Sequence, residues 1–270
     1  MKVNKALTIA GSDSGGGAGI QADIKTFQEL GVYGMTAITA ITAQNTLGVH
    51  GVYPVATEGI KEQLRAIGED LTPDAVKLGM LFSAEIIEVV AAYIKKFDWN
   101  NIVLDPVMIA KGGASLLQQE AVTALKEHLL PLATVITPNV PEAEVLTGIE
   151  IHNLEDSKKA AQELYNLGVT YVVMKGGHAA YQGNEVIDLL FDGKTFTEYR
   201  SERIDSKQTH GSGCTFAAAL TAALAKGYTA HDAVQEAKDF ISIAIQDELH
   251  IGSGHGPTNH FAYGRQSQRV

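Results

Sequence analysis

Short apolar runs alternate with longer amphipathic stretches along most of this chain, and this order restricts the fold more than any other feature. The runs are typical of buried strands and the stretches of helices. Such alternation predicts β-α-β units, which form a largely parallel sheet with helices on both faces. The expected strands are 6–10, 35–42, 75–78, 101–104, 133–137 and 171–175, and the expected helices are 20–30, 57–69, 83–97, 115–129, 157–167, 214–226 and 230–249.

The region 186–199 breaks the alternation. Two strand-like runs, 186–191 and 196–199, flank an Asp-Gly pair at 192–193, which is a hairpin turn signal. We therefore expect a small antiparallel hairpin there. Because no repeat, low-complexity tract or linker is visible, we predict one domain over residues 1–265 and a frayed tail at 266–270.

Composition excludes some partners. The formal net charge of -10 argues against a nucleic-acid partner, which needs a basic face, but it does not argue against a phosphate substrate. No apolar run approaches a membrane span, and the run at 6–10 is too short for a secretion signal. The single cysteine, Cys214, excludes an intrachain disulfide and fits a reducing compartment, so we expect a cytoplasmic protein.

A glycine-flanked turn leads directly into the Ala-rich stretch 216–225; it reads Thr209-His210-Gly211-Ser212-Gly213-Cys214-Thr215. Backbone N–H groups at a helix start, together with the positive end of the helix dipole, bind anions. The same field should favour the thiolate of Cys214. The turn therefore predicts an anion hole framed by Gly211 and Gly213 with a reactive group inside it, and it points to phosphoryl transfer.

A second glycine-rich segment, 11–19, follows the first expected strand. It matches the dinucleotide-binding fingerprint poorly, because Ile20 stands where a glycine is needed. A tight strand-to-helix turn and a loop that admits a small substrate both remain open. Asp23, one turn further on, could accept hydrogen bonds from such a substrate or only offset the helix dipole.

Residues 193–195 resemble the end of a P-loop. The P-loop pattern also requires a glycine five residues before Gly193, and Asp188 occupies that position.

Two acids follow expected strands. Asp105 precedes a proline and Glu142 lies in Thr-Pro-Asn-Val-Pro-Glu. Each has an ordinary interpretation, as a turn residue and a helix N-terminal acid respectively. On one sheet edge beside an anion hole, the pair instead predicts Mg²⁺ ligands. Lys111, in a glycine-containing loop, and Lys175, at a strand end, could both neutralise phosphate; a solvated loop lysine is the alternative for Lys111.

Taken together, these motifs resemble the ribokinase-like small-molecule kinases, and within them the hydroxymethylpyrimidine/phosphomethylpyrimidine kinases of thiamine biosynthesis. The matching stretches are 10–23, 42–48, 77–80, 105–108, 137–142 and 210–214. The resemblance implies a three-layer α/β sandwich that uses ATP and Mg²⁺. It also implies transfer of a phosphoryl group to 4-amino-5-hydroxymethyl-2-methylpyrimidine, and then a second transfer to the monophosphate.

The resemblance also assigns roles to individual residues. Asp23 and Gln44 would bind the pyrimidine by hydrogen bonds, and Met80 and Val107 would contact its ring. Asp105 and Glu142 would hold the metal, with Asn139 on the same phosphate side. Apart from the resemblance, we expect Ser212, Lys111 and Lys175 at the ATP phosphates from their positions in the chain. In the wider superfamily the anion-hole turn ends in an aspartate that acts as the catalytic base. Here the turn ends in Cys214, which we expect at the reacting hydroxyl. A homodimer is the family expectation.

Two rival functions stay open. A pyridoxal or pyridoxine kinase of vitamin B6 salvage would also phosphorylate a hydroxymethyl group on a small aromatic ring. Gln44 favours the pyrimidine, because an amide can donate to a ring nitrogen and accept from an exocyclic amine. A non-catalytic vitamer- or nucleotide-binding protein on the same fold is the second rival. The combination of Asp105, Glu142, Gly213 and Cys214 argues against it, because a pure binder needs no complete transfer site.

Overall fold

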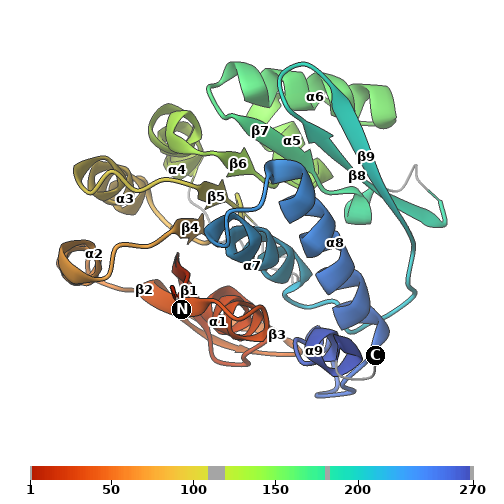
Figure 1. Ribbon diagram of the computed structural model, residues 1–270, viewed down its shortest axis with the longest axis horizontal. Helices are drawn as coiled ribbons and strands as arrows, with labels where there is room; N and C mark the ends of the chain where they lie inside the picture. The colour runs from red at the N-terminus through yellow and green to blue at the C-terminus, as the bar shows by residue number, and fades with distance from the viewer. Residues whose placement is uncertain (1, 109–118, 180–182, 268–270) are drawn as a thin grey trace.

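The structure is a computed structural model that describes residues 2–108, 119–179 and 183–267 (Figure 1). Its elements are β1 (Lys5–Asp13), α1 (Gly19–Glu29), β2 (Tyr33–Asn45), β3 (Gly48–Pro54), α2 (Thr57–Asp70), β4 (Ala75–Leu78), α3 (Ala84–Lys96), β5 (Ile102–Leu104), α4 (Gln119–Ala124), β6 (Val135–Ile136), α5 (Val140–Thr147), α6 (Leu154–Asn166), β7 (Tyr171–Met174), β8 (Glu185–Phe191), β9 (Phe196–Glu202), α7 (Ser212–Ala225), α8 (Ala230–Gln246) and α9 (Ala262–Ser267). A π-helical turn, Leu125–Leu129, and two short 3-10 helices, Leu130–Leu132 and Gly176–His178, complete them.

Within the described ranges the strands form one nine-stranded sheet in the order β3-β2-β1-β4-β5-β6-β7-β8-β9. The six central strands are parallel. β3 pairs antiparallel with β2, and β8 and β9 continue antiparallel from β7. The largely parallel sheet and the antiparallel hairpin predicted from the sequence are therefore confirmed.

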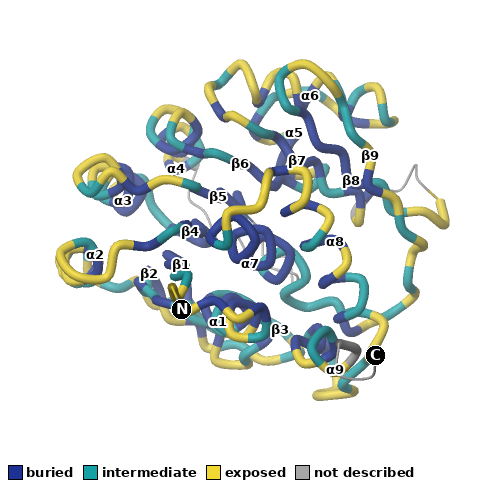
Figure 2. Tube along the Cα trace, viewed as in Figure 1, coloured by how far each residue is buried: buried dark blue, intermediate teal, exposed yellow. Residues whose placement is uncertain are grey.

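Helices cover both faces of the sheet, which completes the three-layer sandwich (Figure 1). Neighbouring strand residues point to opposite faces, so Ala6 belongs to the core under α1, α7 and α8, while Leu7 belongs to the core under α2 to α6. Helix α7 is buried along nearly its whole length and is drawn dark blue in Figure 2. Its many alanines let it lie close to the sheet. No helix in the described ranges is long and apolar enough to span a bilayer.

Some elements differ from the sequence-based expectations, among them α9, which was not expected. Strand β3 was not expected, because it is a partly exposed edge strand without apolar alternation. Helix α5 was also not expected; it is short and begins with Val-Pro after Asn139. The helix expected at 115–129 is described from residue 119 onward, where α4 passes into the π-helical turn, and 115–118 lie outside the described residues.

The carboxyl ends of the parallel strands meet at one edge of the sheet, which is where open α/β sheets bind ligands. Asp13 ends β1, Asp105 follows β5 and Lys175 follows β7. The amino end of α7 comes to the same edge, because Gly213 lies beside Lys175 and Asp105. This edge is the place to examine for function.

Candidate active site

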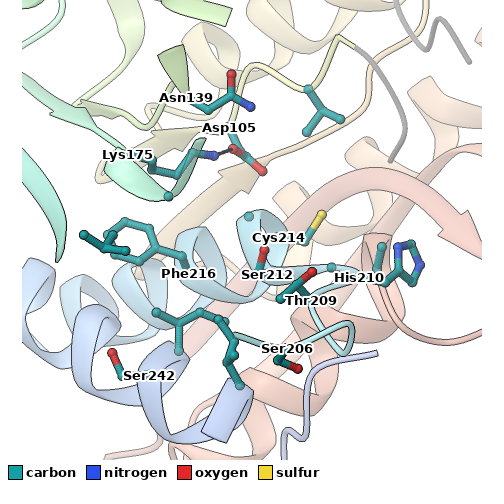
Figure 3. Close-up of a pocket in the computed structure, with 18 of the residues that line it drawn as sticks. Asp105, Asn139, Lys175, Ser206, Thr209, His210, Ser212, Cys214, Phe216 and Ser242 are labelled. Atoms are coloured by element: carbon teal, nitrogen blue, oxygen red, sulfur yellow. Dashed lines mark hydrogen bonds and ion pairs between the residues drawn. The ribbon is translucent and has the colours of Figure 1, made fainter. Parts of the chain in front are cut away.

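A cavity of about 810 Å³ opens at this edge (Figure 3). It collects nearly all the residues that the sequence analysis selected. Those that line it are Gln44, Met80, Asp105, Val107, Asn139, Glu142, Lys175, Gly211, Ser212, Gly213 and Cys214. Asp23 is not among the lining residues, and Lys111 lies outside the described residues.

The turn before α7 has a backbone that only glycine can readily supply. Gly211 has φ +80°, and a side chain there would collide with the carbonyl oxygen of Gly17. A Cβ on Gly213 would lie 3.3 Å from Lys175 Nζ and 3.9 Å from Asp105 Oδ2. The first-turn N–H groups of α7 therefore lie directly beside a cation and a carboxylate.

Charges concentrate at the end of the cavity formed by β5 to β7. Lys175 Nζ donates to Asp105 Oδ1 at 2.8 Å and lies 4.0 Å from Glu142 Oε2. Thr137 Oγ1 donates to the same Asp105 oxygen at 3.2 Å. Burial lowers the pKa of Lys175, but the Asp105 and Glu142 carboxylates outweigh burial and hold that pKa above its usual value. Lys175 is therefore a cation that faces the cavity.

Glu142 fits both interpretations that the sequence left open. Its Oε2 accepts from the Asn139 N–H at 2.8 Å, and its own N–H donates to Asn139 Oδ1 at 2.9 Å, which is a capping box. It is a helix N-terminal acid, yet it also lines the cavity. Burial, with the nearby Asp105 carboxylate, raises the pKa of Glu142 to about 7 although Lys175 opposes the rise. An added cation would relieve this excess of negative charge.

The donor set fits a magnesium ion that keeps most of its waters. Asp105 uses Oδ1 and Glu142 uses Oε2 for contacts within the protein, so each carboxylate has a second oxygen with no protein partner in the described part of the chain. Within the residues that the structure describes, no group of three or more His, Cys, Asp and Glu side chains could enclose a metal ion. One or two carboxylates with waters and substrate phosphates are the usual protein environment of Mg²⁺.

The pKa of the Cys214 thiol differs from the expectation. It is half-buried on the cavity wall, and burial raises the pKa of its thiol to about 11. The Lys77 ammonium lowers this pKa, but Asp23 and Asp105 oppose it. The prediction that the helix start favours the thiolate is therefore wrong, because loss of water and two neighbouring carboxylates outweigh it. At neutral pH Cys214 is a neutral thiol.

Asp23 lies behind the cavity wall and is 0% exposed. Its Oδ2 accepts from Lys77 Nζ at 2.9 Å and from Thr8 Oγ1 at 2.6 Å, while its Oδ1 is buried without a partner. Burial lowers the pKa of Lys77, but the Asp23 carboxylate outweighs burial and raises it, so the pair is ionic. A direct contact between Asp23 and a substrate stays a prediction.

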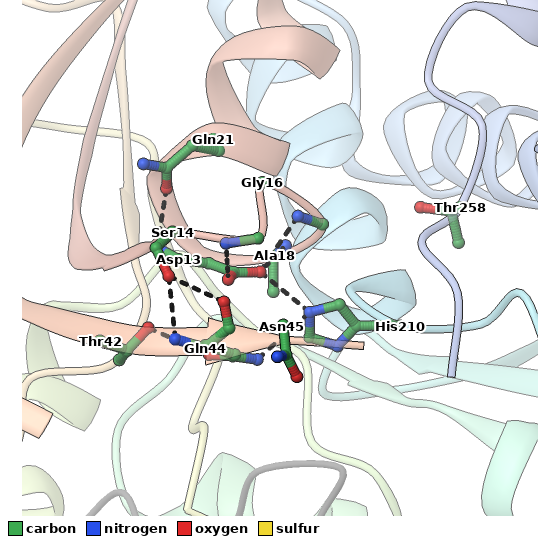
Figure 4. Close-up of polar contacts among 12 residues, drawn as sticks. Asp13, Ser14, Gly16, Ala18, Gln21, Thr42, Gln44, Asn45, His210 and Thr258 are labelled. Atoms are coloured by element: carbon green, nitrogen blue, oxygen red, sulfur yellow. Dashed lines mark hydrogen bonds and ion pairs between the residues drawn. The ribbon is translucent and has the colours of Figure 1, made fainter. Parts of the chain in front are cut away.

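Two polar clusters escaped the sequence analysis. Asp13 accepts from the N–H groups of Gly15, Gly17 and Ala18 at 2.8, 3.0 and 2.9 Å and from His210 at 2.9 Å (Figure 4). Burial raises the pKa of Asp13, but these hydrogen bonds hold it below its usual value. An aspartate two residues before a glycine run is a signal for such a loop.

The second cluster is an ion pair at the opposite end of the cavity. Lys238 Nζ on α8 lies 2.7 Å from Asp188 Oδ2 on β8, and both side chains are buried. Asp188 Oδ1 also accepts from the Gly176 N–H at 2.7 Å, so the pair supports the turn just after Lys175. The sequence analysis did not predict this role for Lys238. The residue pattern of α8 does not show that the Lys238 ammonium contacts an aspartate on β8.

Comparison with known proteins agrees with this geometry. A family model described as phosphomethylpyrimidine kinase matches residues 13–259. The Bacillus subtilis (strain 168) protein named hydroxymethylpyrimidine/phosphomethylpyrimidine kinase is 60% identical over 267 residues, which are 99% of this chain and 98% of that protein. The protein of the same name from Haemophilus influenzae is 55% identical and covers 97% of this chain and 98% of its own length.

Solved structures include the pyridoxal kinase from Staphylococcus aureus in complex with AMP-PCP and pyridoxal. It superposes with a TM-score of 0.90 at 40% identity and covers 98% of this chain and 96% of that one. The family resemblance inferred from the motifs is thus confirmed over almost the full length. The chain belongs to the phosphomethylpyrimidine kinase family.

Proposed function

We propose that this protein is an ATP-dependent kinase that phosphorylates 4-amino-5-hydroxymethyl-2-methylpyrimidine and then its monophosphate, in thiamine biosynthesis. The names of its relatives support this reading. The observation that carries it is the contact between the anion-binding turn and the cation. The position of a Cβ on Gly213 lies 3.3 Å from Lys175 Nζ, so a phosphoryl group at the start of α7 would meet Lys175 immediately.

The cavity divides into two ends that suit the two substrates. Gln44, Met80 and Val107 lie at the β1–β2 end and offer one amide and apolar surface to a small ring. Asn139, Lys175 and Ser212 lie nearer the β5–β7 end and offer donors to phosphates. Cys214 stands between the two groups, where the reacting hydroxyl would lie. Asp23, behind this wall, is proposed to act on the pyrimidine side.

Phosphoryl transfer depends mainly on positioning and charge stabilisation. Lys175 and the first-turn N–H groups of α7, framed by Gly211 and Gly213, stabilise negative charge on the transferred group. Asp105 and Glu142 would hold Mg²⁺, which neutralises phosphate charge when it is bound. Because the pKa of Cys214 is about 11, its thiol orients the hydroxyl and is not a ready proton acceptor at neutral pH. The proton leaves late in a loose transition state, so a strong base is not required.

Pyridoxal is the second candidate substrate. The Staphylococcus aureus pyridoxal kinase, whose solved complex contains AMP-PCP and pyridoxal, shares the fold at 40% identity. We propose pyridoxal phosphorylation as a side activity, since the relatives that are 60% and 55% identical are both named as pyrimidine kinases. A binding protein without catalysis is the weaker alternative, because Lys175, Asp105 and the α7 turn form a complete phosphate site.

The test is a coupled ADP-release assay with Mg·ATP and three separate acceptors: the pyrimidine alcohol, its monophosphate and pyridoxal. We expect turnover with both pyrimidines and a lower kcat/KM with pyridoxal. Turnover with pyridoxal alone would replace the proposal with vitamin B6 salvage. ATP binding without turnover of any acceptor would favour the binding protein.

Three further predictions from the sequence accompany this proposal. The continuous sheet from β3 to β9 supports one domain over 1–265; α9 includes residues 266 and 267, and the rest of the predicted frayed tail is outside the described residues. A homodimer and a cytoplasmic location stay predictions. Size-exclusion chromatography with light scattering tests the dimer.

A further inference from the structure

His210 joins the two glycine-rich segments of the site. Its Nε2 lies 2.9 Å from Asp13 Oδ2 and 3.2 Å from the Gln44 side-chain nitrogen (Figure 4). The ring also packs on the first glycine loop, because a Cβ on Gly17 would lie 2.5 Å from His210 Cδ2. His210 immediately precedes Gly211, so this one residue links the loop and Gln44 to the anion-binding turn.

The hydrogens in this network can be counted. Hydrogen bonds hold the pKa of Asp13 below its usual value, so its carboxylate only accepts. His210 Nε2 must therefore carry a hydrogen and donate to Asp13, and it cannot also accept from the Gln44 NH₂ group. Two donors would then face each other across 3.2 Å.

The same conflict occurs at the other end of the Gln44 amide. Thr42 Oγ1 lies 2.9 Å from the Ser12 carbonyl oxygen and 3.1 Å from Gln44 Oε1, but a hydroxyl has one hydrogen. The carbonyl of Ser12 can only accept, so it takes that hydrogen. Two acceptors would then face each other between Thr42 and Gln44.

Turning the amide by 180° about its last bond resolves both conflicts at once. Its oxygen then accepts from His210 Nε2–H, which is shared with Asp13, and its NH₂ group donates to Thr42 Oγ1. The second hydrogen of that NH₂ group stays available to a ligand. The backbone of Gln44 cannot shift to avoid this choice, because Ser14 Oγ accepts from its N–H at 2.9 Å and donates to its carbonyl at 2.8 Å.

We propose that His210 is a positioning residue that fixes the Gln44 amide with its oxygen toward His210 and its NH₂ group toward Thr42 and the cavity. This inference rests on the proposed function, in which Gln44 faces the pyrimidine. The fixed amide presents an N–H donor to an acceptor nitrogen of the ring. It selects rings with an acceptor there, and a freely turning amide would not.

The test is a double-mutant cycle between His210→Phe and Gln44→Met, assayed with the pyrimidine alcohol and Mg·ATP. His210→Phe keeps a ring against Gly17 but removes the N–H donor, and Gln44→Met keeps the length of the side chain but removes the amide. We expect His210→Phe to raise KM for the pyrimidine about tenfold, with kcat and KM for ATP changed less than twofold. In the Gln44→Met background the same substitution should have no further effect on KM.

Two matched variants extend the cycle. Thr42→Val, which removes the hydroxyl, should raise KM for the pyrimidine, and Thr42→Ser, which keeps it, should not. Thermal melts identify variants that have lost the fold. Additive effects of His210→Phe and Gln44→Met in a folded, active enzyme would overturn the inference. Absence of pyrimidine turnover in the wild-type enzyme would instead overturn the proposed function, so the two failures are distinguishable.

Discussion

Two lysine–aspartate pairs have nearly the same geometry but different surroundings. Lys77 Nζ lies 2.9 Å from Asp23, and both side chains are 0% exposed. Lys175 Nζ lies 2.8 Å from Asp105, and its side chain is 13% exposed to the cavity. Both side chains of the first pair are closed to solvent, although Lys77 borders the cavity, so this pair contributes mainly to folding and to the field around Cys214. The second can share its lysine with an arriving phosphate.

The difference shows that a charge pair near a cavity is not automatically part of the chemistry. Removing one partner of a sealed pair leaves a buried charge without compensation, which costs about 3–5 kcal/mol of stability. Removing Lys175 leaves the Asp105 carboxylate, which is 2% exposed but lines the cavity, so water there can solvate part of its charge. Stability should therefore report on the Lys77 pair, and catalysis on the Lys175 pair.

The largest effect is expected from Lys77→Met, which should lower the free energy of unfolding by about 3–5 kcal/mol. The measurement is urea denaturation followed by circular dichroism. Lys61→Met is the matched control, because Lys61 forms an exposed pair with Glu58 and should change stability by less than about 1 kcal/mol. A Lys77→Met variant as stable as this control would remove the distinction between sealed and open pairs.

Lys175→Met should affect catalysis more than stability, because it changes the pair that borders the cavity. We expect kcat to fall about 100-fold, since loss of about 3 kcal/mol of charge stabilisation corresponds to that factor, with a smaller loss of stability than Lys77→Met. Steady-state ADP release and the same urea titration measure both. If Lys175→Met unfolds as easily as Lys77→Met but keeps its turnover when folded, Lys175 is structural.

Glu142→Gln tests the charge at the β5–β7 end of the cavity through the pH dependence of stability. The pKa of Glu142 is raised from 4.5 to about 7, so the folded enzyme binds a proton between these values that the unfolded chain releases. The contribution of Glu142 to stability therefore decreases as pH rises through this window. Relative to Glu142→Gln, the wild-type enzyme without nucleotide should lose about 3 kcal/mol between pH 4.5 and 8.

Glutamine keeps the capping contact with the Asn139 N–H, so the variant changes the charge and leaves the helix start intact. Thermal or urea unfolding across that pH range is the measurement. Parallel stability curves for the two proteins would contradict the raised pKa. Excess Mg·ATP should reduce the difference, because a cation at the site favours the carboxylate.

Cys214→Ala is expected to have the smallest effect of these four variants. Turnover should fall about tenfold while the dissociation constant of the pyrimidine stays nearly unchanged, because the thiol is proposed to orient the hydroxyl in the transition state. Cys214→Ser, which keeps a small polar group, should recover part of the rate. Isothermal titration and ADP release separate binding from turnover. Unchanged turnover in Cys214→Ala would remove the residue from the reaction.

The sequence predicts well what depends on local pattern. The α7 turn and the strand ends at Asp105 and Lys175 follow from glycine spacing and apolar runs. The pKa of Cys214 could not be predicted in this way, since it depends on burial and on carboxylates from α1 and from the end of β5. The contact of Asp13 with His210 joins residues 197 positions apart. Lys77 was predictable in part, because a lysine inside the apolar run 75–78 needs a buried counter-charge.

The backbone contact between Gly17 and Gly211 has a consequence for synthesis of the protein. The loop after β1 leaves the ribosome about 190 residues before the turn that packs against it. Until then Asp13 lacks His210, and the central strand β1 lacks the cover of α7. A nascent chain can therefore assemble much of its sheet before this turn arrives, and the site is complete only after it has.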